Sequence, residues 1–125
     1  MGVVYHAHYL VYFELGRTEF MRARGISYAS IEERGIRLAV IDARIHYRRP
    51  ALYDQEISVV TTVSAMGGAS VVFDYELREG TGSTLATGST RLGCLDTRHR
   101  PTRLPADIVE ALGRSNDSQP SELAP

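Results

Sequence analysis

Two histidines near the start of the chain are the first side chains with chemistry to offer. His6 and His8 stand two residues apart, and imidazole changes its charge near neutral pH. On a helix this spacing points the two rings to different faces, whereas a metal-binding pair prefers a spacing of four residues. We therefore expect no metal site here. From the residues alone, His6 is most simply a helix-capping or otherwise satisfied polar residue.

The cysteine and the basic residues exclude several other chemistries. Cys94 is the only cysteine, which excludes an internal disulfide and a multi-cysteine zinc site; we expect it to be a small buried hydrophobe. All 14 basic residues are arginine, so Schiff-base and P-loop lysines are excluded. With 15 acidic residues the formal net charge is -1, which gives no bulk attraction to nucleic acid.

Arginines gather in two places along the chain. Arg48 and Arg49 precede Pro50, and a second group, Arg98 with Arg100 and Arg103, follows the last predicted strand. Guanidinium groups suit phosphates. A solvated loop in a protein that uses no lysine explains both clusters equally well.

One long helix must position the histidines. Apolar residues at helical spacing predict a helix over 8–24, ended by Gly25 as a C-cap residue. Its apolar stripe consists of Tyr9, Tyr12, Phe13, Gly16, Phe20 and Ala23. A short second helix is predicted over 28–34.

From residue 37 the apolar period changes to two, which is typical of strands. In the first of them Ala39, Ile41, Ala43, Ile45 and Tyr47 are expected on one face. Four strands, at 37–49, 57–65, 71–78 and 84–96, are joined by short turns and predict an antiparallel meander.

The end of the chain completes the domain. Pro105 opens a short helix, and the residues after it, 114–125, are rich in Ser, Pro, Asn and Asp. We expect a single domain over 1–113 and a disordered tail over 114–125.

The architecture follows from the need to bury both apolar faces. A sheet wrapped around one long helix does so, which is an α+β layout. Its edge strands would need cover, so dimerisation is expected. No apolar run approaches the roughly 20 residues that span a bilayer, and no secretory signal is visible. We therefore expect a cytoplasmic protein with no transmembrane segment and no nucleic-acid partner.

The start of the chain resembles a known family. Gly2-Val3-Val4-Tyr5-His6-Ala7-His8-Tyr9-Leu10, followed by Tyr12-Phe13-Glu14, is similar to the opening motif of the 4-hydroxybenzoyl-CoA thioesterase family, most closely its YbgC-like branch. Segments 47–54, 86–90 and 103–105 match in order and spacing, so the resemblance covers residues 1–112. It implies a hotdog fold, an antiparallel sheet around one central helix. The implied function is hydrolysis of an acyl-CoA thioester to a free acid and CoA by a homodimer or homotetramer, with active sites at the dimer interface.

The resemblance also implies roles for particular residues. The backbone N–H of His6, at the N-terminus of the central helix, would polarise the thioester carbonyl, and its imidazole could act as acid or base. Tyr9, Pro50 and Ala51 would contact or shape the acyl site. Arg48, Arg49, Arg100 and Arg103 would bind the phosphates of CoA. No metal or redox cofactor is implied, since CoA is part of the substrate.

One departure from the family pattern leaves the activity open. The family's catalytic Asp would fall about two residues before Met1, together with its first strand. The natural chain could begin earlier, it could be a truncated homologue with weak or no activity, or Glu14 could substitute. The simpler interpretation of Glu14 is a surface or dimer-interface pair with Arg17. The alternative function is a non-catalytic acyl-binding or scaffolding hotdog dimer that has lost the Asp; a dehydratase or isomerase on this fold is a weaker alternative.

Overall fold

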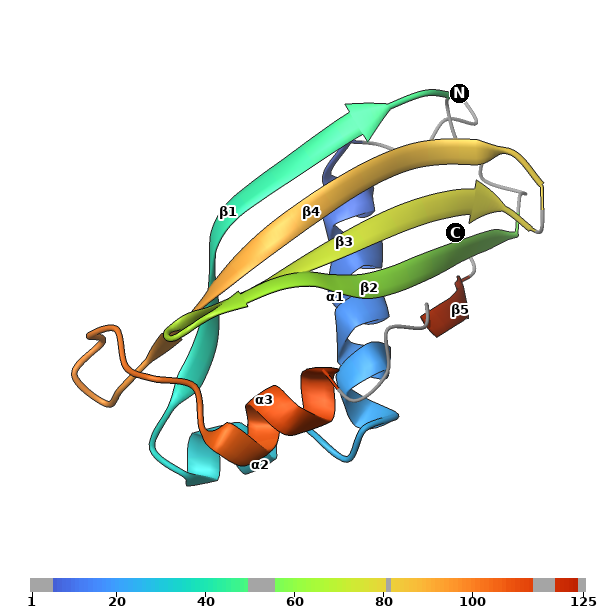
Figure 1. Ribbon diagram of the computed structural model, residues 1–125. Helices are drawn as coiled ribbons and strands as arrows, with labels where there is room; N and C mark the ends of the chain where they lie inside the picture. Colours follow the sequence, from blue (N-terminus) through green and yellow to red (C-terminus); the bar gives the residue numbers. More distant parts are fainter. Residues whose placement is uncertain (1–5, 50–55, 81, 114–118, 124–125) are drawn as a thin grey trace.

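The structure, a computed structural model, describes residues 6–49, 56–80, 82–113 and 119–123 (Figure 1). Pro50 and Ala51, predicted to shape the acyl site, lie outside the described residues. In chain order the elements are α1 (His6–Arg22), α2 (Tyr28–Glu33), β1 (Arg37–Tyr47), β2 (Ile57–Gly67), β3 (Ser70–Glu79), β4 (Thr84–Leu95), α3 (Ala106–Gly113) and β5 (Gln119–Leu123).

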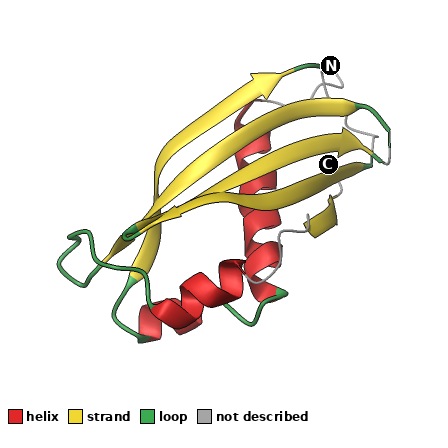
Figure 2. Cartoon of the chain, in the orientation of Figure 1, coloured by secondary structure: helices red, strands yellow, loops and turns green. Residues whose placement is uncertain are grey.

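The five strands form one antiparallel sheet in the order β1-β4-β3-β2-β5. The sheet curves across α1, and α2 and α3 gather at one end of it (Figures 1 and 2). The α+β layout predicted from the change of apolar period is therefore confirmed. No described helix is long and apolar enough to cross a membrane.

The helix α1 ends where its sequence predicts. Gly25 has a φ of +77°, and its N–H donates to the carbonyl of Arg22 at 3.0 Å. A left-handed residue of this kind is the usual way to stop a helix, and glycine adopts it without a steric penalty.

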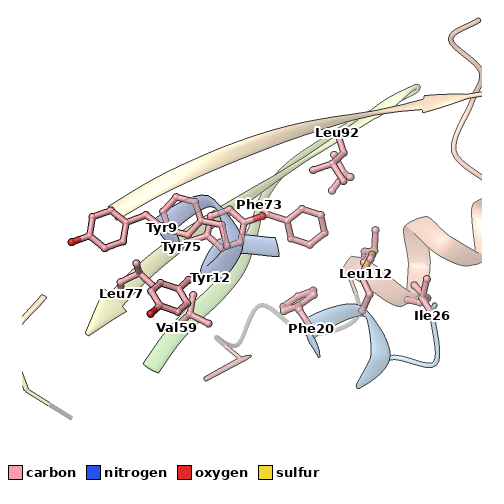
Figure 3. Packing of buried hydrophobic residues seen from close by; sticks show 14 of the residues in the cluster. Tyr9, Tyr12, Phe20, Ile26, Val59, Phe73, Tyr75, Leu77, Leu92 and Leu112 are labelled. Atoms are coloured by element: carbon pink, nitrogen blue, oxygen red, sulfur yellow. The ribbon is translucent and has the colours of Figure 1, made fainter. Parts of the chain in front are cut away.

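The core lies between α1 and the inner face of the sheet. Phe13 stacks on Tyr75 with ring centroids 4.4 Å apart, and Phe20 meets Phe73 edge-on at 5.8 Å. Figure 3 shows the rings of Phe20, Phe73 and Tyr75 in a cluster that continues to Leu112 of α3. The alternation predicted for β3 is confirmed, because Val71, Phe73, Tyr75 and Leu77 are all buried.

The alternation predicted for β1 is wrong in its first half. The pairing of β1 with β4 shifts between Val40 and Asp42, so Ile41 is the extra residue of a bulge and is 59 % exposed. Ile45 still faces the core opposite Gly88. Before the bulge the faces exchange, so Val40 pairs with core-facing Leu92 while Ala39 points to the outer face.

The tail also differs from the expectation. Gln119–Leu123, within the segment expected to be disordered, forms β5 and pairs antiparallel with Ile57–Thr61 of β2. The reason is that β2 would otherwise be an edge strand with unpaired N–H and C=O groups, which a second extended segment satisfies.

Candidate functional site

The N-terminal end of α1 is the first part of the site. The helix begins at His6, as the family motif implies. The first four N–H groups of a helix have no partner within it, and its dipole places partial positive charge there. This end can therefore polarise a carbonyl oxygen. The His6 side chain lies outside the described residues, so its acid–base role stays a prediction.

The end of β1 lies beside the start of α1. The rings of Tyr9 and Tyr47 are 5.0 Å apart between centroids, and burial together with the neighbouring Tyr9 raises the pKa of Tyr47. Tyr9 itself is only 2 % exposed and belongs to the core. It could contact an acyl group only at the buried end of a pocket, so its predicted binding role is not tested by the structure.

Arg48 and Arg49 extend this end of β1. Their backbone N–H groups both donate to the carbonyl of Leu85, at 2.9 and 3.0 Å, and Nη1 of Arg49 donates to Oγ of Ser83 at 3.0 Å. Both side chains are exposed. The first arginine cluster thus lies at the strand end next to the N-terminus of α1.

The second cluster lies at the opposite end of the sheet. Oδ1 of Asp96 accepts the backbone N–H groups of Arg98 and Arg100, at 2.8 and 3.0 Å, and so orders the loop after β4. Arg100 and Arg103 are exposed on this loop. The length of β4, Thr84–Leu95, separates the two clusters by roughly 35 Å along the strand. One chain therefore does not bring the four predicted phosphate-binding arginines together.

A hollow of about 300 Å³ lies along α1, between this helix and the strands β1 and β4. Its lining residues come from α1, β1 and β4 and are Leu10, Val11, Glu14, Arg17, Val40, Ala43 and Thr90. Its walls are mainly apolar, and two opposite charges stand in it. It begins at Leu10, one helical turn from His6, and its apolar walls suit an acyl group.

The sequence predicts Arg17, which lines this hollow, in a surface or dimer-interface pair with Glu14. Arg17 is 7 % exposed, and its Nε donates to the hydroxyl of Tyr28 at 3.0 Å. The hydroxyls of Tyr75 and Thr90 share a hydrogen bond of 2.6 Å, and burial raises the pKa of Tyr75. The signal was available, because Arg17 stands four residues after Phe13 and three before Phe20, on the apolar stripe.

The acidic residues of α1 do not complete a catalytic site within one chain. The first turn of α1 contains none. Glu14 is eight residues from His6, about 12 Å along the helix axis, so it cannot attack a carbonyl held at the helix N-terminus of the same chain. Among the described residues no group of three His, Cys, Asp or Glu side chains could hold a metal ion.

A larger hollow, about 460 Å³, lies on the other face of the sheet. Arg44, His46, Asp74, Thr87 and Ser89 contribute to its polar lining. Register places these side chains opposite one another on the outer face, away from α1. We place the site at α1 because no helix of the described residues begins at this larger hollow, so it has no helix-terminal donors.

Known proteins agree with this geometry. Residues 1–112 match the model of the thioesterase-like superfamily. The acyl-CoA thioesterase YbgC of Haemophilus influenzae is 32% identical over 112 residues, 88% of this chain and 82% of the relative. The acyl-CoA thioester hydrolase YbgC of Escherichia coli is 29% identical over 109 residues, 86% of this chain and 81% of the relative.

A solved structure supports the same assignment. The DHNA-CoA thioesterase from Staphylococcus aureus superposes with a TM-score of 0.85 at 33% identity, covering 91% of this chain and 79% of that one. The predicted hotdog fold and thioesterase activity are thereby confirmed. The chain belongs to the thioesterase-like superfamily and is a YbgC-like thioester hydrolase with the hotdog fold.

Proposed function

We propose that this chain hydrolyses acyl-CoA thioesters at the N-terminal end of α1. The observation that carries the proposal is the start of that helix at His6, beside the strand end that bears Arg48 and Arg49. The His6 N–H points its dipole at the thioester carbonyl and stabilises the oxyanion that forms when the carbonyl is attacked. One such donor can lower the barrier by about 3 kcal/mol.

The proposed assembly is a homodimer that pairs along β1, with a homotetramer as a dimer of such dimers. β1 ends the sheet, and no described strand pairs with its outer edge. Val40, Ile41 and Tyr47 on this strand are 47 %, 59 % and 42 % exposed. A long, exposed, apolar edge strand invites pairing with another chain. A twofold axis at the middle of β1 satisfies the most backbone groups, because the whole strand then pairs with its copy.

This assembly would unite the two arginine clusters. Within one chain Arg37 of β1 pairs with Leu95, so it lies next to the loop of Arg100 and Arg103. Antiparallel pairing of β1 with its copy brings the Arg37 end of one chain beside the Tyr47 end of the other. A CoA at the α1 N-terminus would then meet Arg48 and Arg49 of one chain and Arg100 and Arg103 of the second copy.

We also propose that the reaction uses no metal or redox cofactor and takes place in the cytoplasm. The chemistry needs an attacking group and an oxyanion donor, and the helix supplies the donor. Cys94 is a free, buried thiol, which suits a reducing compartment. Dialysis against EDTA should leave the rate unchanged.

The second candidate, a non-catalytic acyl-binding or scaffolding dimer, is favoured by one observation. The first turn of α1 has no acidic residue, so the attacking carboxylate must come from elsewhere. In the family pattern an Asp shortly before the Gly-Val-Val-Tyr-His motif has this role. A hydrolysis assay should therefore compare the chain beginning at Met1 with a version extended upstream, on short aliphatic, fatty and aromatic acyl-CoAs. Inactivity of both folded proteins on every substrate would favour the scaffold.

A second experiment tests the oxyanion donor itself. His6→Pro removes the backbone N–H, and proline is tolerated in the first helical turn. His6→Ala keeps the N–H and removes only the imidazole. We expect kcat to fall about 100-fold or more in His6→Pro, and less in His6→Ala. Equal kcat values for His6→Pro and His6→Ala would reject the donor role.

A further inference from the structure

Arg17 is a buried charge without an opposite charge. It is 7 % exposed, and no carboxylate among the described residues forms an ion pair with it. A buried cation loses its hydration, and only a partner of opposite charge with good geometry offsets that loss. The fold nevertheless holds Arg17 in place through the hydroxyls of Tyr28 and Tyr75. A guanidinium has five N–H donors, and Nε serves the bond to Tyr28.

Glu14 is a complementary charge that is close by in sequence yet does not pair. It stands three residues before Arg17, lines the same hollow and is exposed. On the same helix Glu19 and Arg22, at the same spacing, do pair, with Oε2 and Nη2 2.6 Å apart. The Glu14–Arg17 pair suggested by the sequence is therefore absent within the chain, because the core holds the Arg17 side chain.

The hollow lies where a second copy would meet it. Val40 and Ala43, which line it, flank Asp42, the middle residue of β1 (Arg37–Tyr47). A twofold axis through the middle of β1 brings the two hollows face to face and sets the two α1 helices side by side and antiparallel. Each contact across such an axis occurs twice, with residue i meeting j and j meeting i.

We infer that Glu14 of each copy enters the hollow of the other and pairs with Arg17, giving two reciprocal ion pairs at the centre of the dimer. This inference rests on the dimer of the proposed function, although not on its hydrolytic activity. The apolar rim completes the contact, since Leu10, Val11 and Leu15 of α1 are 40 %, 47 % and 43 % exposed. The opposite charges of Glu14 and Arg17 on each copy make this surface complementary to itself across the twofold axis.

The test uses the symmetry of the proposed contact. In a homodimer of the Glu14→Arg variant, both symmetric contacts would place two positive charges opposite each other. In a homodimer of the Arg17→Glu variant, both contacts would place two negative charges opposite each other. A mixture of the two variants restores both ion pairs in the heterodimer. We expect each variant alone to raise the dimer dissociation constant about 100-fold or more in analytical ultracentrifugation, and the mixture to recover the wild-type value within a few fold. Failure of the folded mixture to recover would overturn the inference.

A matched control covers the risk that Arg17→Glu does not fold. Glu19→Arg changes the same charge on the same helix, at a residue whose pair lies within its own chain. Glu14→Arg should weaken the dimer while Glu19→Arg leaves it unchanged; equal effects would overturn the inference.

Two further outcomes distinguish a failure of the ion pairs from a failure of the proposed dimer or of the proposed hydrolysis. A wild-type chain that stays monomeric at high concentration would remove the dimer, and the ion pairs with it, while hydrolysis could persist. If in addition Arg17→Gln raised KM for acyl-CoA, the hollow would be assigned to the substrate in place of a second copy.

Discussion

The two sides of α1 differ in how closely they are packed. On the inner side Phe13 is fully buried and Gly16 lies so close to β2 that a methyl group there would meet Oγ1 of Thr61 at 2.7 Å. On the outer side Val11 and Leu15 are 47 % and 43 % exposed. Apolar residues thus surround the helix, but the single chain buries only one side. Packing of the inner side stabilises the fold of the single chain, and the exposed apolar residues of the outer side are available for association.

Gly88 of β4 offers the strongest test of the inner side. A methyl group there would clash with the ring of Phe13 and come within 2.6 Å of the carbonyl of Arg44. Because backbone cannot move aside, Gly88→Ala should lower the free energy of unfolding by about 3 kcal/mol, measured by urea unfolding. The control is Gly68→Ala in the β2–β3 turn, where nothing lies within 4 Å. A comparable loss in both variants would mean that the close contacts of Gly88 with Phe13 and Arg44 do not cause the effect.

Gly16 tests the same side from the helix. Gly16→Ala would press on Thr61, whose hydroxyl is buried and has no hydrogen-bond partner among the described residues. We expect a loss of about 2 kcal/mol in the free energy of unfolding, despite the better helix propensity of alanine. Thr61→Ala in the same chain should restore about 1 kcal/mol, whereas Thr61→Ser, which keeps Oγ, should not. Additive effects of Gly16→Ala and Thr61→Ala would contradict the proposed clash.

The outer side should respond in a different measurement. Val11→Ser removes apolar surface that the single chain leaves exposed, so the stability of the monomer should change by less than about 0.5 kcal/mol. The dimer dissociation constant should rise about tenfold, equivalent to about 1.4 kcal/mol. Glu33→Ser on α2, also exposed, serves as the control with no effect on assembly. A dissociation constant unmoved by Val11→Ser would place the interface elsewhere.

Sequence periodicity predicted the inner side well and the outer side poorly. The face of β3 followed from alternation alone, since Val71, Phe73, Tyr75 and Leu77 need only the pleat of a strand to share a side. The bulge at Ile41 is a backbone event that adds one residue, and an apolar period contains no sign of it.

The site was predictable where one helix or one motif carries it. The start of α1 at His6 came from the family motif. The apolar stripe could have indicated that Arg17 is buried, but its partners Tyr28 and Tyr75 come from two other elements. Spacing along one helix cannot reveal partners from elsewhere. The separation of the arginine clusters was predictable in principle, because the length of the predicted strand over 84–96 already sets it.

The surface ion pair between α2 and α3 should have the smallest effect on stability. The pH dependence of that effect shows whether the ion pair causes it. Arg34 of α2 donates two hydrogen bonds to Asp107 of α3, at 2.8 and 2.9 Å, and both side chains are exposed. The Arg34 hydrogen bond, with help from backbone N–H groups, holds the pKa of Asp107 below its usual value. A lowered pKa in the folded state stabilises the protein above the unfolded pKa of about 3.9. That contribution is lost as the pH falls through the folded pKa.

Wild type should therefore have a slightly higher Tm than Asp107→Asn at pH 7, and the difference in Tm should disappear as the pH falls below about 4.

The same comparison in an Arg34→Gln background shows whether the ion pair is responsible. With Arg34 absent, Asp107 keeps only its favourable position in the first turn of α3, so most of the gap at pH 7 should disappear. A gap that stays the same in that background would assign the effect to the helix terminus. A gap as large as that of Gly88→Ala would break the comparison between inner packing and outer surface, since exposed ion pairs contribute little in water.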